Sequence, residues 1–173
     1  MRFPASMQLT GRLASLLVAS SLAAFSAACA APTSPSSTGG TSDSSAWNGN
    51  VSASLSFCAD ELNRYRASVG LKPLGRAPEL ESFAAQAAEY DGKLGVPHQY
   101  FKMTNGGGIA RAENQLLLWR GWAVDDVIRE GMKRMWSEGP GGSHYETIKG
   151  NYTMVGCGIF INGSEVNISQ DFR

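Results

Sequence analysis

The chain has 173 residues, of which 43% are hydrophobic, and it carries 15 basic against 15 acidic side chains. This length fits one domain with a tail, and this hydrophobic content excludes a wholly disordered chain. Without a leader that ends at Ala28, 13 basic residues remain against 15 acidic ones, so we expect no nucleic-acid partner, because nucleic-acid-binding domains show a clustered basic excess.

Residues 1–29 are predicted to be a signal peptide, of the lipoprotein type. A positively charged start precedes the apolar residues 13–25, which are too few to span a bilayer comfortably. Small residues directly before Cys29 indicate a bacterial lipobox, in which Cys29 would be lipidated and become the first residue of the mature protein. Cleavage after Ala30 is the alternative. We therefore expect an outer-membrane or cell-surface lipoprotein, held to the membrane only by its lipid, or otherwise a secreted extracellular protein.

Residues 30–50 are predicted to be a flexible linker rich in serine and threonine. Residues 33–46 contain nine of these two residue types, with few apolar side chains. Such a segment cannot bury enough apolar surface to offset the entropy lost on ordering. Residues 51–173 then form the folded domain, which we expect to be monomeric.

Two cysteines remain if Cys29 takes a lipid, and export would place them where disulfides persist. A bond between Cys58 and Cys157 would close a loop of about 100 residues, which favours the folded state by roughly 4–5 kcal/mol in a chain-entropy treatment. The alternative is two separate buried thiols that pack as small hydrophobic side chains. We favour the disulfide.

The first predicted helix carries Cys58, Leu62, Tyr65 and Val69 on one face. Gly70 is expected to end it. A second helix is expected to begin near Ala77 and to end at Gly92, and a third to cover residues 125–138, with acidic residues in its first turn and basic ones in its last. The predicted buried residues of these two helices are Leu80, Phe83, Ala84, Ala87, Ala88, Val127, Ile128, Met132, Met135 and Trp136.

The last part of the chain changes to an alternating pattern. Apolar residues alternate over residues 154–161 and again over 166–172, and Asn162-Gly163 between them is a strong signal for a hairpin turn. Residues 113–119 are a plausible third strand. Apolar residues on both faces indicate a sheet that is covered on both sides. The sequence therefore predicts an α+β fold, an α-β-α sandwich with a small antiparallel sheet between helical layers.

Both histidines of the chain lie in loop-like surroundings rather than in an apolar stripe. His98 follows the second predicted helix and His144 follows the third. Glu113 opens the candidate third strand. Glu138 ends the third helix, where the helix dipole disfavours a carboxylate, so we expect a nearby cation or imidazolium to compensate it.

Six short motifs follow one another along residues 63–172, the first of which has two parts. They are Asn63-x-x-Arg66 with Gly70-Leu71-x-Pro73-Leu74, Ala112-Glu113-Asn114, Met135-Trp136-Ser137-Glu138, Ser143-His144-Tyr145, Val155-Gly156-Cys157-Gly158 and Ile168-Ser169-Gln170-Asp171-Phe172. In this order they resemble the motifs of bacterial exported members of the CAP superfamily, also called the SCP domain, which includes cysteine-rich secretory proteins, venom antigens and plant pathogenesis-related proteins. Ala112 and Ser143 stand where that family has glycine, and Met135 stands where it has tryptophan.

The resemblance implies that His98, Glu113, Glu138 and His144 meet in one central cavity. Two imidazoles and two carboxylates are a donor set that can hold a divalent cation, such as Zn²⁺ or Mg²⁺. If the protein has catalytic residues, we expect them to be these four. A site without metal is the alternative, in which each carboxylate stabilises a protonated histidine.

The resemblance favours a binding module outside the cytoplasm, whose ligand would be a lipid or a cell-surface or extracellular protein. The second hypothesis is a metal-dependent, peptidase-like hydrolase that uses the same histidines and glutamates. The third is a structural interaction protein of the cell surface. We lean against an enzyme, because no HExxH pair is present.

Overall fold

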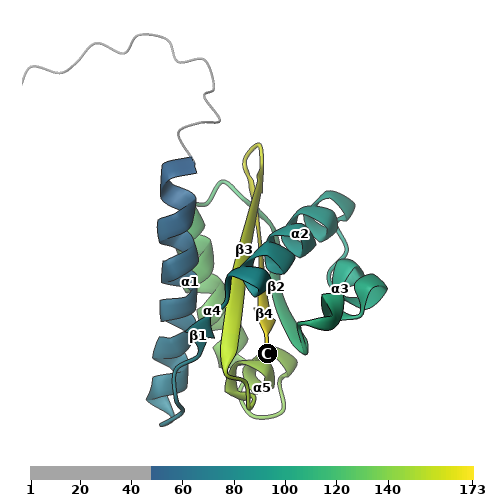
Figure 1. Cartoon of the computed structure of the whole chain (residues 1–173). Helices are drawn as coiled ribbons and strands as arrows, with labels where there is room; N and C mark the ends of the chain where they lie inside the picture. Colours follow the sequence, from purple (N-terminus) through teal and green to yellow (C-terminus); the bar gives the residue numbers. More distant parts are fainter. Residues whose placement is uncertain (1–47) are drawn as a thin grey trace, which may run out of the picture. The chain divides into compact units, whose positions relative to one another are not determined.

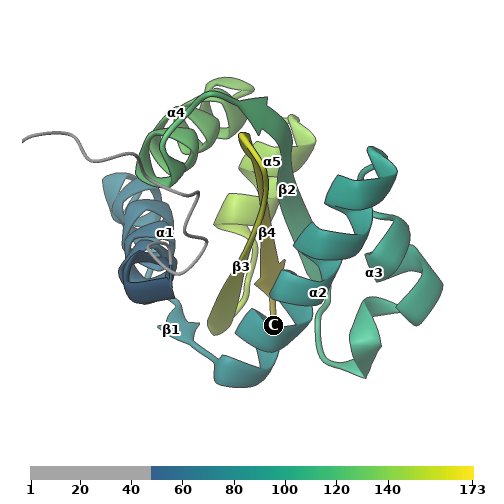
Figure 2. The ribbon, with the colours of Figure 1, turned by 90° about the horizontal axis from the view of Figure 1, so that it is seen from above.

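The computed structural model describes residues 48–173, with side chains from residue 51 onward, so the predicted signal peptide, Cys29 and most of the predicted linker lie outside the described residues. In this part a four-stranded sheet lies between two layers of helices (Figures 1 and 2). The elements are α1 (Asn48–Ser68), β1 (Gly75–Arg76), α2 (Pro78–Leu94), α3 (Gln99–Thr104), the 3-10 helix η2 (Gly106–Gly108), β2 (Ala112–Arg120), α4 (Val124–Ser137), α5 (Ser143–Lys149), β3 (Met154–Asn162) and β4 (Glu165–Phe172).

The sheet has the strand order β1-β3-β4-β2. β3 and β4 form the predicted hairpin, and β2 pairs with β4, both antiparallel. This confirms the α+β sandwich and the three strands expected from the sequence. The sequence did not predict β1, whose two residues pair in parallel with β3. Two exposed residues are too few to show the alternation of apolar and polar side chains from which a strand is predicted.

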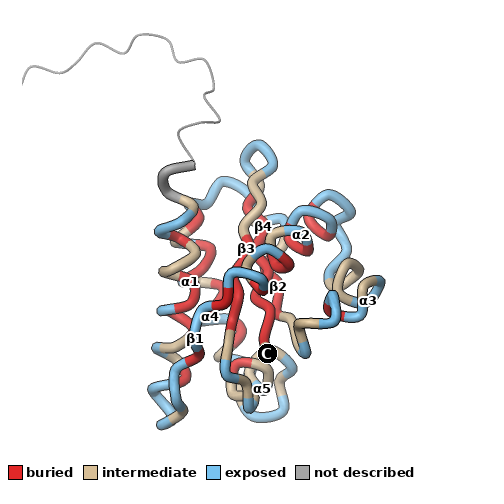
Figure 3. The backbone as a smooth tube through the Cα atoms, viewed as in Figure 1, coloured by how far each residue is buried: buried red, intermediate tan, exposed pale blue. Residues whose placement is uncertain are grey.

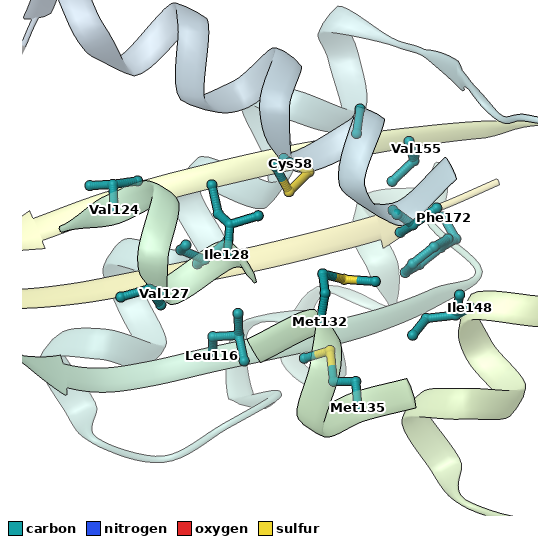
Figure 4. Close-up of a cluster of buried hydrophobic side chains, with 14 of the residues drawn as sticks. Cys58, Leu116, Val124, Val127, Ile128, Met132, Met135, Ile148, Val155 and Phe172 are labelled. Atoms are coloured by element: carbon teal, nitrogen blue, oxygen red, sulfur yellow. A yellow bond between two sulfur atoms is a disulfide. The ribbon is translucent and has the colours of Figure 1, made fainter. Parts of the chain in front are cut away.

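One face of the sheet packs against α1 and α4 to form the apolar core. Because side chains alternate along a strand, Val155 and Cys157 of β3 lie on the same face as Ile168 and Phe172 of β4. These residues are buried together with Met132 of α4 (Figure 4). The buried stripe predicted for α4 is confirmed, except that Trp136 is only partly buried.

The other face of the sheet is covered by α2, which lies directly against β3. A Cβ atom at Gly158 would overlap the backbone of Ala84 and Ala85, so this close approach requires glycine. The five predicted core residues of α2 are all buried, and Figure 3 shows the exposed residues of α2 alternating with them. α2 is also longer than predicted, because Gly92 lies inside it and Gly95 ends it in a left-handed conformation with φ of 71°.

The first helix is the least well predicted of the three. It begins at Asn48, within the segment assigned to the linker, and ends at Ser68. Val69 lies beyond its end and is 44% exposed, so its assignment to the buried face was wrong. Arg66 instead closes the helix: it is 3% exposed and its guanidinium donates hydrogen bonds to the carbonyls of Lys72, Ile148 and Gly150. The Asn63-x-x-Arg66 motif therefore holds the chain after α1 in place.

Cys58 and Cys157 form the predicted disulfide, which joins α1 to β3. Both residues are buried, with exposed fractions of 0% and 1%. The bond therefore crosses the apolar core between the helical layer and the middle of the sheet. None of the helices in residues 48–173 has both the length and the apolar character needed to cross a membrane.

Candidate functional site

The first histidine pairs with the first glutamate. His98 precedes α3 in a left-handed conformation with φ of 63°. Its ring Nδ1 lies 2.9 Å from Oε1 of Glu113, near the start of β2, and its backbone N–H donates to Oε1 of Gln115 at 2.8 Å. Because side chains alternate between the two faces of a strand, Glu113 and Gln115 of β2 lie on the same face. One strand therefore fixes both the ring and the backbone of His98.

Glu113 has its side chain 1% exposed. Burial raises its pKa, the hydrogen bond and charge of His98 oppose that rise, and the charge of Asp91 adds to it, so that the pKa of Glu113 is raised overall. The amide of Gln115 lies between the two carboxylates, 2.8 Å from Oδ2 of Asp91 and 3.2 Å from Oε2 of Glu113. Gln115 therefore links the His98–Glu113 pair to the buried face of α2.

A third carboxylate, Asp171, belongs to the same buried cluster. It is the register partner of Glu113 on β4, and it is 0% exposed. Neither of its oxygens has a hydrogen-bond partner among the described residues. Burial, followed by the charges of Glu113 and Asp91, raises the pKa of Asp171 to about 9. One feature of the sequence points to this residue. Asp171 is next to Phe172 in an alternating strand, so its side chain faces the opposite side of a sheet that is predicted to be covered on both sides.

The second histidine, in the first turn of α5, pairs with the second glutamate, at the end of α4. Nδ1 of His144 lies 2.5 Å from Oε1 of Glu138, and the backbone N–H of His144 donates to Oε2 at 3.0 Å. Partial burial raises the pKa of Glu138, but the hydrogen bonds from the ring and backbone of His144 outweigh it, and the pKa is lowered. The carboxylate at the end of α4 is thus engaged by both the backbone and the ring of His144.

The structure arranges the four predicted residues as two pairs. His98 contacts β2 through Glu113 and Gln115, while α5, which carries His144, packs beside β2. Within residues 48–173, no group of three or more histidine, cysteine, aspartate or glutamate side chains has an arrangement that could hold a metal ion. Each glutamate instead engages Nδ1 of its own histidine.

The pairing determines which atom each imidazole offers to a ligand. An ionised carboxylate can only accept a hydrogen bond, so a neutral imidazole beside it carries its proton on Nδ1. Nε2 is then left with its lone pair, and it has no hydrogen-bond partner among the described residues in either histidine. The side chains of His98 and His144 are 33% and 31% exposed. Each histidine is therefore held by a glutamate on one side and reachable from solvent.

The family comparison agrees with the sequence motifs. A family described as "CAP: Cysteine-rich secretory protein family" matches residues 59–172. Among solved structures, an outer surface protein from Borrelia burgdorferi is 15% identical with a TM-score of 0.48, covering 73% of this chain and 92% of that one. A cysteine-rich secretory protein from Staphylococcus aureus is also 15% identical with a TM-score of 0.48, covering 70% of this chain and 39% of that one. No curated protein matches the chain.

Proposed function

The chain belongs to the CAP family of cysteine-rich secretory proteins, and from this premise we propose that it is an exported binding module that engages its ligand through His98 and His144. The disulfide between Cys58 and Cys157 supports export, because such bonds persist in oxidising compartments. The signal peptide expected over residues 1–29 points the same way. Lipidation at Cys29 would hold a monomeric domain near the membrane, where a lipid or a surface protein is the expected ligand.

One observation carries the proposal: two partly exposed histidines are each oriented through Nδ1 by a glutamate. Fixing Nδ1 also fixes the direction of Nε2, so the ligand meets a nitrogen whose position is already determined. Such preorganisation lowers the entropy lost on binding.

In this proposal a divalent cation would have fewer protein ligands than the sequence led us to expect. The atoms left for it are the two imidazole nitrogens rather than all four side chains, and imidazole nitrogen suits Zn²⁺ better than Mg²⁺, which prefers oxygen. Glu113 and Glu138 would then orient the ligating rings, as carboxylates do around many zinc-binding histidines. A bound ion would supply a Lewis acid there.

The hydrolase remains the second candidate, because an imidazole oriented by a carboxylate can also act as a general base. The structural interaction protein ranks third. The two experimental arms described next separate these candidates, since the binding module requires the histidines for ligand affinity and the hydrolase requires them for turnover.

The proposal is tested by titrating the full-length protein with two probes, palmitate as a lipid and Zn²⁺ as a cation. The variants are the double variant His98→Gln/His144→Gln and the matched control Gln99→Ala, which changes the residue next to His98. We expect at least one probe to bind the wild type and the control equally. Its affinity for the double variant should fall at least about tenfold, the usual effect of losing an oriented ligand group.

Two results would contradict the proposal. One is that neither probe binds, or that the double variant binds as tightly as the wild type. The other is that casein is cleaved in the presence of Zn²⁺ and that cleavage is lost in the double variant, which would establish the hydrolase instead.

A further inference from the structure

A pocket with a volume of about 250 Å³ opens between α2 and α3. Four of its lining residues, Gln86, Glu89, Tyr90 and Lys93, follow one another along one side of α2, with the spacing of neighbours on a helix surface. The fifth, Tyr100, lies in the first turn of α3. None of these residues belongs to the two histidine–glutamate pairs.

Two tyrosine rings form the apolar part of this pocket. The ring centroids of Tyr90 and Tyr100 are 5.7 Å apart and their planes are tilted by 46°. Tyr90 is 42% exposed. Behind Tyr100 lies the ring of Phe83, with centroids 5.3 Å apart, so the tyrosine pair is supported from the core side. The pocket therefore presents aromatic surface to solvent, with one of its two rings backed by the core.

Tyr100 is held in place by polar contacts at both ends. Its backbone N–H donates to Oδ1 of the buried Asp91 at 2.9 Å, and its hydroxyl donates to Oε1 of Gln86 at 2.7 Å. Asp91 thus fixes α3 against α2 and with it the distance between the two tyrosines. This gives a role to a buried carboxylate that the histidine–glutamate pairs do not contact directly.

The polar part of the pocket has no net charge. Its two charged residues, Glu89 and Lys93, form an ion pair of 2.6 Å, and both side chains are at least half exposed. Because the two opposite charges are paired, they give neither a cation such as a quaternary ammonium nor an anion such as phosphate a net attraction. Hydroxyl groups, by contrast, can both donate to the carboxylate and accept from the ammonium or the Gln86 amide.

We propose that this pocket binds one unit of a neutral saccharide. Tyrosine rings would contact the apolar C–H face of the sugar, while Gln86, Glu89 and Lys93 would hydrogen-bond its hydroxyls. The volume is below the roughly 300–1,000 Å³ of pockets for drug-sized ligands, which suits a single sugar ring. Since the pocket is open, the rest of an oligosaccharide can extend across the surface. This proposal does not rest on the binding proposed at His98 and His144.

The test is a titration of the full-length protein with three neutral oligosaccharides, cellotetraose, maltotetraose and chitotetraose, followed by saturation-transfer NMR. Choline chloride and inorganic phosphate serve as charged probes. For a small open pocket we expect a dissociation constant on the order of 1 mM for at least one saccharide. Tyr90→Ala should weaken that binding at least about tenfold, whereas Tyr90→Phe should retain it, since the phenyl ring keeps the stacking surface.

The matched control is Trp122→Ala, which removes another aromatic side chain that is 46% exposed but lies outside the pocket. It should bind the saccharide like the wild type. The proposal is overturned if none of the saccharides binds when its concentration is about ten times the expected dissociation constant. It is also overturned if Tyr90→Ala binds the saccharide as well as the wild type does, or if choline or phosphate binds more tightly than the saccharides. Because Tyr90 is exposed, these variants are expected to fold, which far-ultraviolet circular dichroism verifies.

Discussion

Replacing both bridge cysteines, Cys58→Ala together with Cys157→Ala, is expected to lower the free energy of unfolding by about 4–5 kcal/mol. The two residues are 99 positions apart in sequence, so the disulfide removes a large amount of conformational entropy from the unfolded chain. It also joins α1 to the middle strand β3 through the core. Urea unfolding of the wild type and of the double variant measures the difference directly.

Cys29→Ser is the control for this experiment, because it removes a cysteine that lies outside the bridge, and it should leave the unfolding midpoint unchanged. Reduction of the wild type with dithiothreitol should lower the midpoint as the double variant does. A stability loss of less than about 1 kcal/mol would show that the bridge contributes little to holding α1 on the sheet.

Asp171→Asn is expected to stabilise the protein, and the gain should grow with pH. The pKa of Asp171 is raised from 3.8 to about 9 by burial and by the charges of Glu113 and Asp91. Below about pH 4 the carboxyl is protonated in both states, so it has no effect on stability. Between about pH 4 and pH 9 the unfolded chain releases this proton while the folded chain keeps it, which costs the wild type about 1.4 kcal/mol for each pH unit.

Asparagine cannot ionise and closely matches the shape of the protonated acid, so it removes this cost. At pH 7 the gain should reach up to about 4 kcal/mol, and at pH 4 it should nearly vanish. Denaturant unfolding at the two pH values measures it, with Asp60→Asn, an exposed carboxylate on α1, as the control. A gain that is equal at both pH values, or a loss at pH 7, would contradict a buried protonated Asp171.

The sequence predicted the elements with a long, regular apolar pattern. α2, α4 and the β3–β4 hairpin lie where their buried residues recur at helical or strand spacing, and Asn162-Gly163 lies at the hairpin turn. The ends of helices were harder to predict from the sequence. Gly92 and Gly95 both lie near the end of α2, and by residue type either of them could end the helix. The structure distinguishes them: a Cβ at Gly92 would lie 2.6 Å from the Asn167 side chain, so Gly92 serves packing rather than termination.

For the candidate site, the structure adds how the four predicted residues are arranged. The family resemblance pointed to His98, Glu113, Glu138 and His144, but it could not show that each glutamate engages its own histidine. That outcome depends on the left-handed backbone at His98 and on the short helices α3 and α5, which have too few residues for a periodic pattern. Asp91 and Asp171 were not predicted, because the packing of α2 on the sheet brings Asp91 near Glu113 and the pairing of β2 with β4 places Asp171 beside it.

The central claim is that each histidine is held by a glutamate at Nδ1 and offers Nε2 to the ligand. Long-range ¹H–¹⁵N NMR of the imidazoles, recorded near neutral pH with and without added Zn²⁺, measures this directly. We predict that both rings carry their proton on Nδ1, and that Zn²⁺ shifts the Nε2 signals while the Nδ1 protons are retained. Protons on Nε2 in the free protein, or loss of the Nδ1 protons when Zn²⁺ is added, would contradict the claim.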